Sequence, residues 1–189
     1  MIFVAAAAVV GAFLVLSKNR IAEEVNAVSM SNPADWKKFD ELFKKSAAKH
    51  GVDWMHLKAI AMNESSLGKH PSVVRGMQNP YDIEGSKSSD GKSWGLMQVT
   101  VTTARDMDPL ANEIKLNNPE YSIELAAKYF AWLKRYFKDG SFRQLEWLVK
   151  SYNQGAGNSI KERDGKSAGF AHEYWERFKR NLERVKENP

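Results

Sequence analysis

Residues 59–66 of the chain read AIAMNESS, an apolar run of helical character that ends in a single carboxylate, Glu64. Two later stretches complete the pattern: SWGLMQV at residues 93–99, a loop hinged on Gly95, and SYNQGAG at residues 151–157. A carboxylate in the last turn of a helix gains nothing from the helix dipole and tends to be pushed toward protonation. Because local structure does not explain an acid at this place, we interpret Glu64 as a functional residue.

The short motifs occur in a fixed order, with ES at residues 64–65, GLMQ at 95–98 and YN at 152–153. In this order and at domain-scale spacing they resemble the family 1 lytic transglycosylases, the soluble-type Slt catalytic domain, which are murein-cleaving relatives of goose-type lysozyme. The resemblance covers residues 39–174, and IELAAKYF at residues 123–130 looks like the family's third motif. It implies a mainly α, lysozyme-like α+β fold: a helical catalytic domain with a short hairpin and loop region.

The resemblance implies a murein lytic transglycosylase, which cleaves the β-1,4 bond between N-acetylmuramic acid (MurNAc) and N-acetylglucosamine (GlcNAc) and forms 1,6-anhydro-MurNAc. Enzymes of this family use one Glu, first as the acid that protonates the bond and then as the base that activates the muramic 6-hydroxyl. Matched by motif, that residue is Glu64. To begin protonated near neutral pH it needs an apolar, dry setting that raises its pKa. We expect Met62, Met97 and Tyr152 to form that setting.

The resemblance also assigns substrate-binding roles to the neighbours of Glu64. Ser65 matches the family serine that hydrogen-bonds and orients the catalytic Glu. Gln98 and Asn153 match positions that contact amide or hydroxyl groups of the sugars. Met97 and Tyr152 are expected at the substrate as well, and packing in the core is the alternative for both.

One departure from the related lysozymes concerns the type of reaction. Goose-type lysozymes, which add water, often carry an Asp just after Gly-Leu-Met-Gln-x, and this chain has Thr100 there. A hydrolytic muramidase remains the alternative, and its candidate second carboxylates are Asp82, Glu84 and Asp90 in the loop region. Further alternatives are a secretion-system transglycosylase and a structural, murein-binding virion component. The intact Glu64 argues against the inert component, because a retired enzyme is free to lose its acid.

The composition is that of a folded protein. The chain has 189 residues, 43% hydrophobic and 27% charged, which suits one domain plus an appendage and argues against global disorder. It has no cysteine, which excludes disulfides, thiolate zinc sites and a Cys nucleophile. Its four histidines lack the spacing of a helical zinc site. No metal ion or organic cofactor is expected. The net charge of +5 would draw the protein to envelope polyanions, and glycan strands of peptidoglycan, rather than nucleic acid, are the expected partner.

Residues 2–16 form an unbroken apolar run with Lys18 and Arg20 behind it and no basic residue ahead of it. This arrangement favours an uncleaved membrane anchor over a signal peptide. We therefore divide the chain into a transmembrane anchor helix (1–20), a linker (21–33) and the lysozyme-like domain (34–189). Because basic residues follow the anchor, the positive-inside rule puts the domain on the cytoplasmic side. That orientation fits a phage protein packaged in a virion or viral membrane, with virion proteins as partners; a bacterial envelope with secretion-channel proteins is the alternative.

Hydrophobic spacing and capping signals predict the helices of the domain. Residues 68–93 hold several Pro and Gly and are predicted to form loops rather than a helix of any length, with a short hairpin near residues 81–83 and 94–99. The predicted helices cover residues 34–50, 53–64, 100–107, 119–137, 142–152 and 170–187.

Overall fold

The computed structural model describes residues 33–137 and 142–189. The predicted anchor at residues 2–16 lies outside these ranges. Within them, none of the helices has the length and apolar character needed to cross a bilayer.

The chain divides into two compact units, residues 1–38 and residues 39–189. In the first unit, the described segment is a short helix, α2 (Pro33–Lys37).

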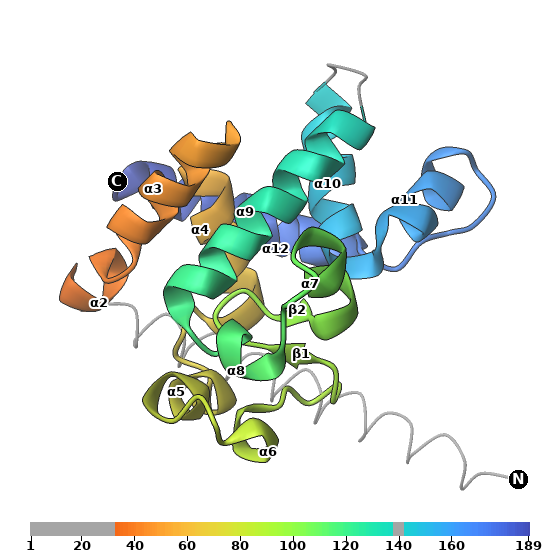
Figure 1. Ribbon diagram of the computed structural model, residues 1–189. Coiled ribbons are helices and arrows are strands. Elements are labelled where there is room, and N and C mark those ends of the chain that lie inside the picture. The colour runs from red at the N-terminus through yellow and green to blue at the C-terminus, as the bar shows by residue number, and fades with distance from the viewer. Residues whose placement is uncertain (1–32, 138–141) are drawn as a thin grey trace, which may run out of the picture. The chain divides into compact units, whose positions relative to one another are not determined.

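The second unit consists of helices and one small sheet (Figure 1). The predicted mainly α fold with a short hairpin is therefore confirmed. The two strands are antiparallel and pair Ser93 with Thr100 and Trp94 with Val99. The hairpin is therefore formed by neighbouring residues of the chain, and the prediction of a strand at residues 81–83 is wrong. In chain order the elements are α3 (Asp40–His50), α4 (Trp54–Ser65), α5 (Pro71–Gln78), α6 (Ile83–Ser86), β1 (Ser93–Trp94), β2 (Val99–Thr100), α7 (Val101–Met107), α8 (Glu113–Leu116), α9 (Pro119–Tyr136), α10 (Phe142–Gln154), α11 (Ala156–Arg163) and α12 (His172–Glu187).

Helix α4 is enclosed by other helices on most of its surface. Asp53 caps it, since its carboxylate accepts a hydrogen bond from the Met55 amide at 2.8 Å. The helix contacts α3, α9 and α12, and a helix that is apolar nearly all round belongs in a core. Its buried residues are Leu57, Lys58, Ala59, Ile60, Ala61, Met62 and Ser65. The end of such a helix is a fixed position, with Ser65 buried and Glu64 half-buried.

A buried ion pair joins α3 to α4. The side chain of Lys58 has no exposed surface and that of Asp40 is 6% exposed, and Lys58 Nζ lies 2.7 Å from Asp40 Oδ1. The Lys58 ammonium also lies 5.7 Å from the centroid of the Trp54 ring. The mutual attraction offsets the cost of removing both charges from water only while both partners are present.

The helix predicted over residues 34–50 is two helices. Helix α2 ends at Lys37 and α3 begins at Asp40, because Phe39 lies between them with φ −113° and ψ 5°, outside the helical range. Gly51 follows the last residue of α3 in the left-handed conformation, at φ 66°, and the helix ends at residue 50 as predicted.

Residues 68–93 contain two helices that the Pro and Gly content argued against. Helix α5 has Pro71 in its first turn, where the missing amide hydrogen costs nothing. Gly76 is needed inside α5, because a Cβ at this position would lie 2.4 Å from Asn117 Oδ1. Helix α6 begins at a cap formed by Asp82. Here Gly and Pro allow close packing and a helix start, so interpreting them as breakers was wrong.

The helices predicted at residues 119–137 and 142–152 are confirmed as α9 and α10. Asn118 caps α9 by accepting a hydrogen bond from the Tyr121 amide at 3.1 Å, and Pro119 takes the first turn. The short helices α8 and α11 were not predicted.

Replacing Asp40 with Ala should lower the free energy of unfolding by about 3 kcal/mol, because it removes the carboxylate that neutralises the buried Lys58. Urea unfolding followed by circular dichroism measures the loss. The matched control is the double variant Asp40→Leu with Lys58→Met, which removes both charges and should recover most of it. A loss below about 1 kcal/mol for the single variant would contradict the role given to this ion pair.

Candidate active site

Glu64 occupies the last turn of α4, and the backbone turns sharply directly after it. Ser66, Leu67 and Gly68 follow with φ of 53°, 57° and 81°, all in the left-handed region. Ser65 supports this turn, because its hydroxyl accepts a hydrogen bond from the Gly68 amide at 2.9 Å. Left-handed conformations cost non-Gly residues about 1–2 kcal/mol each, so the neighbouring structure stabilises this sharp turn away from the carboxylate.

The Glu64 carboxylate accepts a hydrogen bond from Tyr174, whose hydroxyl lies 2.5 Å from Oε1. Burial raises the pKa of Glu64 to about 7, from its ordinary value of 4.5. The hydrogen bond from Tyr174 and the positive charge of Arg177 lower that pKa, while the negative charge of Asp90 raises it further. Burial outweighs the other influences. Glu64 therefore exchanges its proton near neutral pH, which suits a group that acts as both acid and base.

Two hydrogen bonds fix α12 against α4 beside Glu64. Asn63 donates from Nδ2 to the backbone oxygen of Tyr174 at 3.0 Å. Asn181, two turns further along α12, donates from Nδ2 to Asn63 Oδ1 at 2.8 Å. The residue directly before the acid therefore sets the position of the helix that carries Tyr174.

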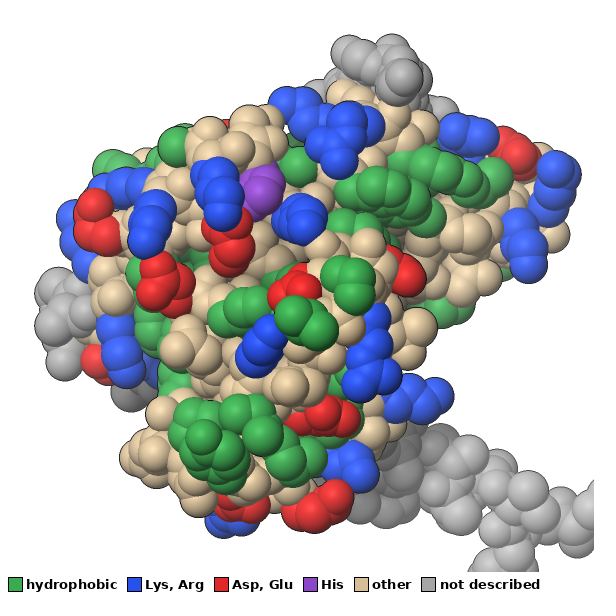
Figure 2. Space-filling view, viewed as in Figure 1, with side chains coloured by type: hydrophobic (Ala, Val, Ile, Leu, Met, Phe, Trp, Pro, Cys, Tyr) green, Lys and Arg blue, Asp and Glu red, His purple; other side chains and the backbone are tan. Residues whose placement is uncertain are grey.

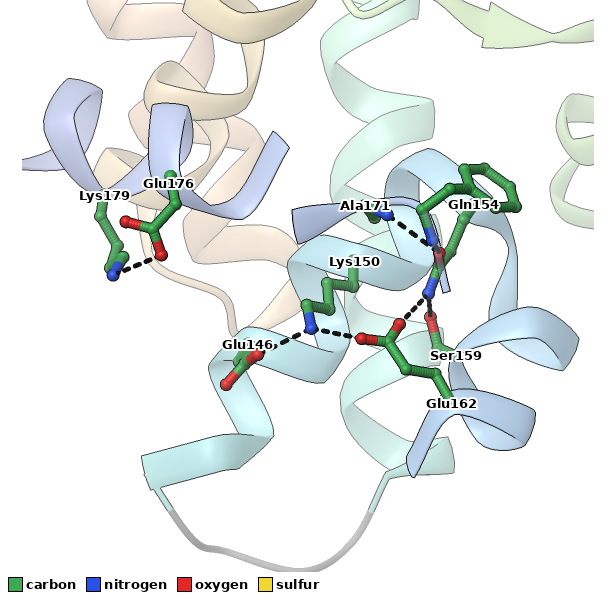
Figure 3. A network of polar contacts seen from close by, with 9 residues as sticks. Glu146, Lys150, Gln154, Ser159, Glu162, Ala171, Glu176 and Lys179 are labelled. Carbon is green, nitrogen blue, oxygen red and sulfur yellow. Dashed lines mark hydrogen bonds and ion pairs between the residues drawn. The ribbon is translucent and has the colours of Figure 1, made fainter. Parts of the chain in front are cut away.

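Gln154 holds the beginning of α12 (Figure 3). Its Oε1 accepts hydrogen bonds from the backbone amides of Phe170 at 3.0 Å and Ala171 at 3.2 Å, which lie directly before the helix. Its Nε2 donates to Ser159 Oγ at 3.1 Å and to Glu162 Oε2 at 2.7 Å, both on α11. One buried amide thus joins α10, α11 and the start of α12.

Lys150 completes this network from α10. Its ammonium lies 2.6 Å from Glu162 Oε1 and 2.8 Å from Glu146 Oε1. Burial works to raise the pKa of Glu162, but hydrogen bonds from Lys150 and Gln154 outweigh it and hold that pKa below its ordinary value. The network in Figure 3 is therefore charged at neutral pH, and it positions Ala171, the residue that caps α12 three residues before Tyr174.

The loop between the two strands is fixed against α8, α9 and α4. Gly95 has φ 74°, and a Cβ on it would lie 1.9 Å from the backbone oxygen of Leu116, so only glycine fits. Ser122 Oγ accepts from the Met97 amide at 3.1 Å. Ser65 Oγ lies 2.7 Å from the backbone oxygen of Leu96, to which it donates. These contacts place Gln98, the residue after Met97, beside the end of α4.

Glu64 opens into a cavity of about 160 Å³. The residues that line it come from the end of α4, from the hairpin and the loop before it, and from α7, α9 and the end of α10. Its walls are formed by Glu64, Asp90, Ser93, Gln98, Val99, Thr100, Thr103, Tyr129, Tyr152 and Asn153. Most of these side chains carry a hydroxyl, amide or carboxyl group, which is the lining that a sugar needs.

The structure brings four of the predicted site residues together at this cavity: Glu64, Gln98, Tyr152 and Asn153. Met97 is fully buried, and the Tyr152 hydroxyl donates to its backbone oxygen at 2.9 Å. Ser65 is also buried and bonds backbone atoms, whereas the hydrogen bond to Glu64 comes from Tyr174. Met97 and Ser65 therefore hold the residues of the cavity wall in place without lining the cavity themselves.

Comparison with known proteins is decisive for the family. The family described as Transglycosylase SLT domain matches residues 41–174. The chain belongs to this family. It is 28% identical over 141 residues to the membrane-bound lytic murein transglycosylase F of Hahella chejuensis, which covers 73% of this chain and 24% of that protein. It is 32% identical over 152 residues to the protein of the same name from Pseudomonas syringae pv. syringae, which covers 78% of this chain and 26% of that protein. The chain thus spans about a quarter of the length of these relatives.

The three candidate second carboxylates lie in different places in this SLT domain. Asp90 lines the cavity, whereas Asp82 caps α6 by accepting from the Gly85 amide at 2.9 Å, and Glu84 is exposed beside Lys87. Burial works to raise the pKa of Asp90, but hydrogen bonds from Ser88, Lys92 and Ser93 outweigh it and lower that pKa. Asp90 is thus an ionised side chain that organises its loop. Among the described residues, no group of three or more His, Asp or Glu side chains is arranged to hold a metal ion.

Two residues of the SLT domain site were missed from the sequence. Tyr174 fell only within the helix predicted at residues 170–187, and Tyr129 only within the IELAAKYF run. A buried tyrosine needs a partner for its hydroxyl, which is the one signal in the sequence that could have singled out Tyr174. Its partner lies 110 residues away, and local spacing does not identify a contact at that distance.

Replacing Gly95 with Ala should destabilise the protein by more than the 1–2 kcal/mol that a left-handed backbone alone costs, because the new Cβ meets the fixed backbone oxygen of Leu116. Gly165→Ala is the matched control, since Gly165 has φ 69° and open space around it. Thermal unfolding of both variants measures the difference. Equal losses for the two would contradict the close approach at Gly95.

Glu64 should make stability depend on pH. The folded state binds the proton of Glu64 more tightly than the unfolded state does. The contribution of the protonated carboxyl group to the free energy of unfolding is therefore complete below pH 4.5 and is lost as the pH rises through 7. Glu64→Gln removes this dependence. The variant should be more stable than the natural protein by roughly 3 kcal/mol at pH 8 and nearly equal to it at pH 4. Urea unfolding at both pH values measures this; a pH-independent difference would contradict it.

Proposed function

We propose that this chain is a peptidoglycan lytic transglycosylase that cleaves the β-1,4 bond between MurNAc and GlcNAc and forms 1,6-anhydro-MurNAc. The observation that carries the proposal is the Glu64 carboxyl, whose pKa is about 7, in a cavity lined by the amide groups of Gln98 and Asn153. Family membership and the names of the relatives, membrane-bound lytic murein transglycosylase F, support it.

In the first step Glu64 acts as the acid. Its proton passes to the bridging oxygen while the bond from C1 of MurNAc to that oxygen breaks, and GlcNAc leaves as the alcohol. Burial favours the protonated acid at neutral pH. Tyr174 holds the carboxyl by one oxygen, Oε1, which leaves the other for the substrate. The N-acetyl group of the MurNAc itself stabilises the positive charge at C1.

In the second step Glu64, now a carboxylate, acts as the base. It takes the proton of the muramic 6-hydroxyl while the oxygen of that hydroxyl forms a bond to C1. The acid is thereby restored and no water is consumed. A pKa near neutrality serves both steps, because the group must give and take a proton with similar ease.

The products of murein digestion test this proposal. Mass spectrometry should show muropeptides lighter by one water than their hydrolytic counterparts and resistant to borohydride reduction. Glu64→Gln should slow their release by about 10²–10⁴-fold, the usual contribution of a general acid–base group, without loss of folding. Retention of the natural rate by this variant would contradict the role of Glu64.

Hydrolysis is the second candidate function, and the place of Asp90 in the cavity wall is the observation that favours it. A carboxylate that lines the same cavity as Glu64 could activate a water molecule in a muramidase reaction. Reducing muramic ends among the products, together with loss of activity in Asp90→Asn but not in the control Asp82→Asn, would establish this reaction. Anhydro products that persist in Asp90→Asn would exclude it.

We further propose that the enzyme opens the wall locally during phage infection from a membrane-attached position in the virion. The support is the apolar run at residues 2–16 and the basic residues behind it. Detection of the protein in purified virions, extracted by detergent but not by salt, is the expected result. Its recovery with a bacterial secretion channel would favour the secretion-system setting instead.

A further inference from the structure

The start of α12 depends on a side chain from another helix. Its N-terminal boundary residue is Ala171, whose side chain has no atom that could accept a hydrogen bond and cap the helix. Gln154 of α10 compensates for this, because its Oε1 accepts hydrogen bonds from the amides of Phe170 and Ala171. Both Ala171 and Gln154 are buried. The Gln154 amide therefore fixes the two residues from which α12 starts.

The first turn of α12 extends this fixed position to the catalytic acid. The backbone oxygen of Ala171 accepts a hydrogen bond from the Trp175 amide at 3.0 Å, which closes the turn that contains Tyr174. The Tyr174 hydroxyl in turn lies 2.5 Å from Glu64 Oε1. A hydrogen bond depends on both distance and angle. A shift or tilt of this turn would therefore weaken the contact with Glu64.

The carboxylate of Glu162 determines which way the Gln154 amide faces. A glutamine amide can present either its oxygen or its NH2 group to a neighbour, whereas an ionised carboxylate only accepts hydrogen bonds. Glu162 Oε2 lies 2.7 Å from Gln154 Nε2, so the NH2 group is directed to Glu162 and Oε1 to the amides before α12. Lys150 favours the ionised form of Glu162, since its ammonium lies 2.6 Å from Oε1.

Glu162 belongs to a helix outside the catalytic cavity. Helix α11 packs on α10, and Figure 2 shows it as a projection with Lys and Arg side chains at its outer end. The walls of the cavity come from elements other than α11 and α12. Gly169, at φ 60°, allows the loop after α11 to approach Glu162, because a Cβ at this position would collide with the carboxylate. Any influence of Glu162 on Glu64 therefore passes through α12.

A second contact limits how far the first turn can move. Asn63 of α4 donates to the backbone oxygen of Tyr174 at 3.0 Å, so Tyr174 stays near Glu64 even when the helix start is released. Gln154 therefore contributes to the exact placement of the Tyr174 hydroxyl rather than to its presence. Catalysis is sensitive at this scale, because misplacement by about 1 Å can slow a reaction about 100-fold.

We propose that Gln154 and Glu162 are positioning residues for the reaction, which fix the first turn of α12 and thereby keep the Tyr174 hydroxyl on the Glu64 carboxyl group. They act through Tyr174 and touch neither the substrate nor the reacting atoms. The inference deepens the proposed function, on which its kinetic test rests, whereas its second test needs no substrate.

A double-mutant cycle with Tyr174→Phe on the full chain tests this path. Gln154→Met keeps the length of the side chain and removes its amide. It should lower kcat on uncrosslinked murein strands about tenfold, because the acid is no longer held in place. It should leave KM unchanged, because the cavity walls come from elements other than α12. Tyr174→Phe should lower kcat at least as much, and adding Gln154→Met to it should have no further effect.

Gln144→Met is the matched control. Gln144 lies on the same helix, and its Nε2 also donates to backbone oxygens, but to those of Lys134 and Phe137 at the end of α9. This variant should lower the free energy of unfolding as Gln154→Met does and leave kcat unchanged. An equal loss of kcat in the two variants would overturn the inference, since it would reflect a general loosening of α10.

Glu162→Gln is a milder second variant, with circular dichroism to establish that each protein is folded. It leaves Lys150 with Glu146 as its partner at 2.8 Å, so no buried ammonium is left without a carboxylate. It should lower kcat less than Gln154→Met does, and only while Tyr174 is present. Effects of Gln154→Met and Glu162→Gln that persist in full in the Tyr174→Phe background would overturn the inference.

The titration of Glu64 provides the second test. Burial raises the pKa of Glu64 to about 7 against the lowering effect of the hydrogen bond from Tyr174. Other groups that act on Glu64 are Arg177 in the next turn of α12, Asp90 before the hairpin and Tyr152 on α10. Gln154→Met should therefore move the midpoint, followed by carbon-13 NMR, above that of the natural protein, and should not move it further in the Tyr174→Phe background.

The two tests separate this inference from the proposed function. If the natural protein cleaves murein but Gln154→Met changes neither kcat nor the Glu64 midpoint, the inference is overturned and the proposed function stands. Absence of cleavage by the natural protein would overturn the proposed function, and the midpoints of the cycle would then decide the inference alone. A midpoint that rises with Gln154→Met only while Tyr174 is present supports it, and an unchanged midpoint overturns it.

Discussion

The hydrogen bond between Tyr174 and Glu64 is the contact on which the rest of the site depends. It joins the end of α4 to the first turn of α12 at a place where burial would otherwise leave a carboxyl group without a partner. Burial raises the pKa of Glu64, and the tyrosine limits that rise while it fixes one oxygen of the group. An acid that is both held in place and close to its titration point is the chemical core of the molecule.

Much of the surrounding structure serves to keep these two helices together. Asn63 holds α12 along its length, and Gln154 holds its beginning. The backbone is strained beside the same site: the non-glycine residues with positive φ in the described ranges are Ser66, Leu67 and Gln98. Such strain persists only where neighbouring contacts determine the conformation, and it concentrates at functional sites. The raised pKa of Glu64, which suits catalysis, also lowers the free energy of unfolding at high pH, so the site is less stable than the same fold with a neutral residue there.

The sequence predicted the residues that line the cavity better than the residues and helices that hold them in place. Motif order was sufficient to bring Glu64, Gln98, Tyr152 and Asn153 to one cavity, and helix periodicity was sufficient for α9 and α10. It was not sufficient for α5, because Pro71 and Gly76 look like helix breakers until the contact with Asn117 is known. Tyr174 was missed for the same reason, since its partner is distant in sequence. Local propensity describes single elements, whereas these features depend on what packs against them.

The most direct test of this account is a titration of the Glu64 carboxyl group itself. Carbon-13 NMR of the folded chain with labelled glutamate, with Glu64→Gln to identify the resonance, measures its pKa without reference to any substrate. The account predicts a midpoint near 7. A midpoint near the ordinary value of 4.5 would mean that Glu64 is ionised at neutral pH, and would contradict its role as the acid.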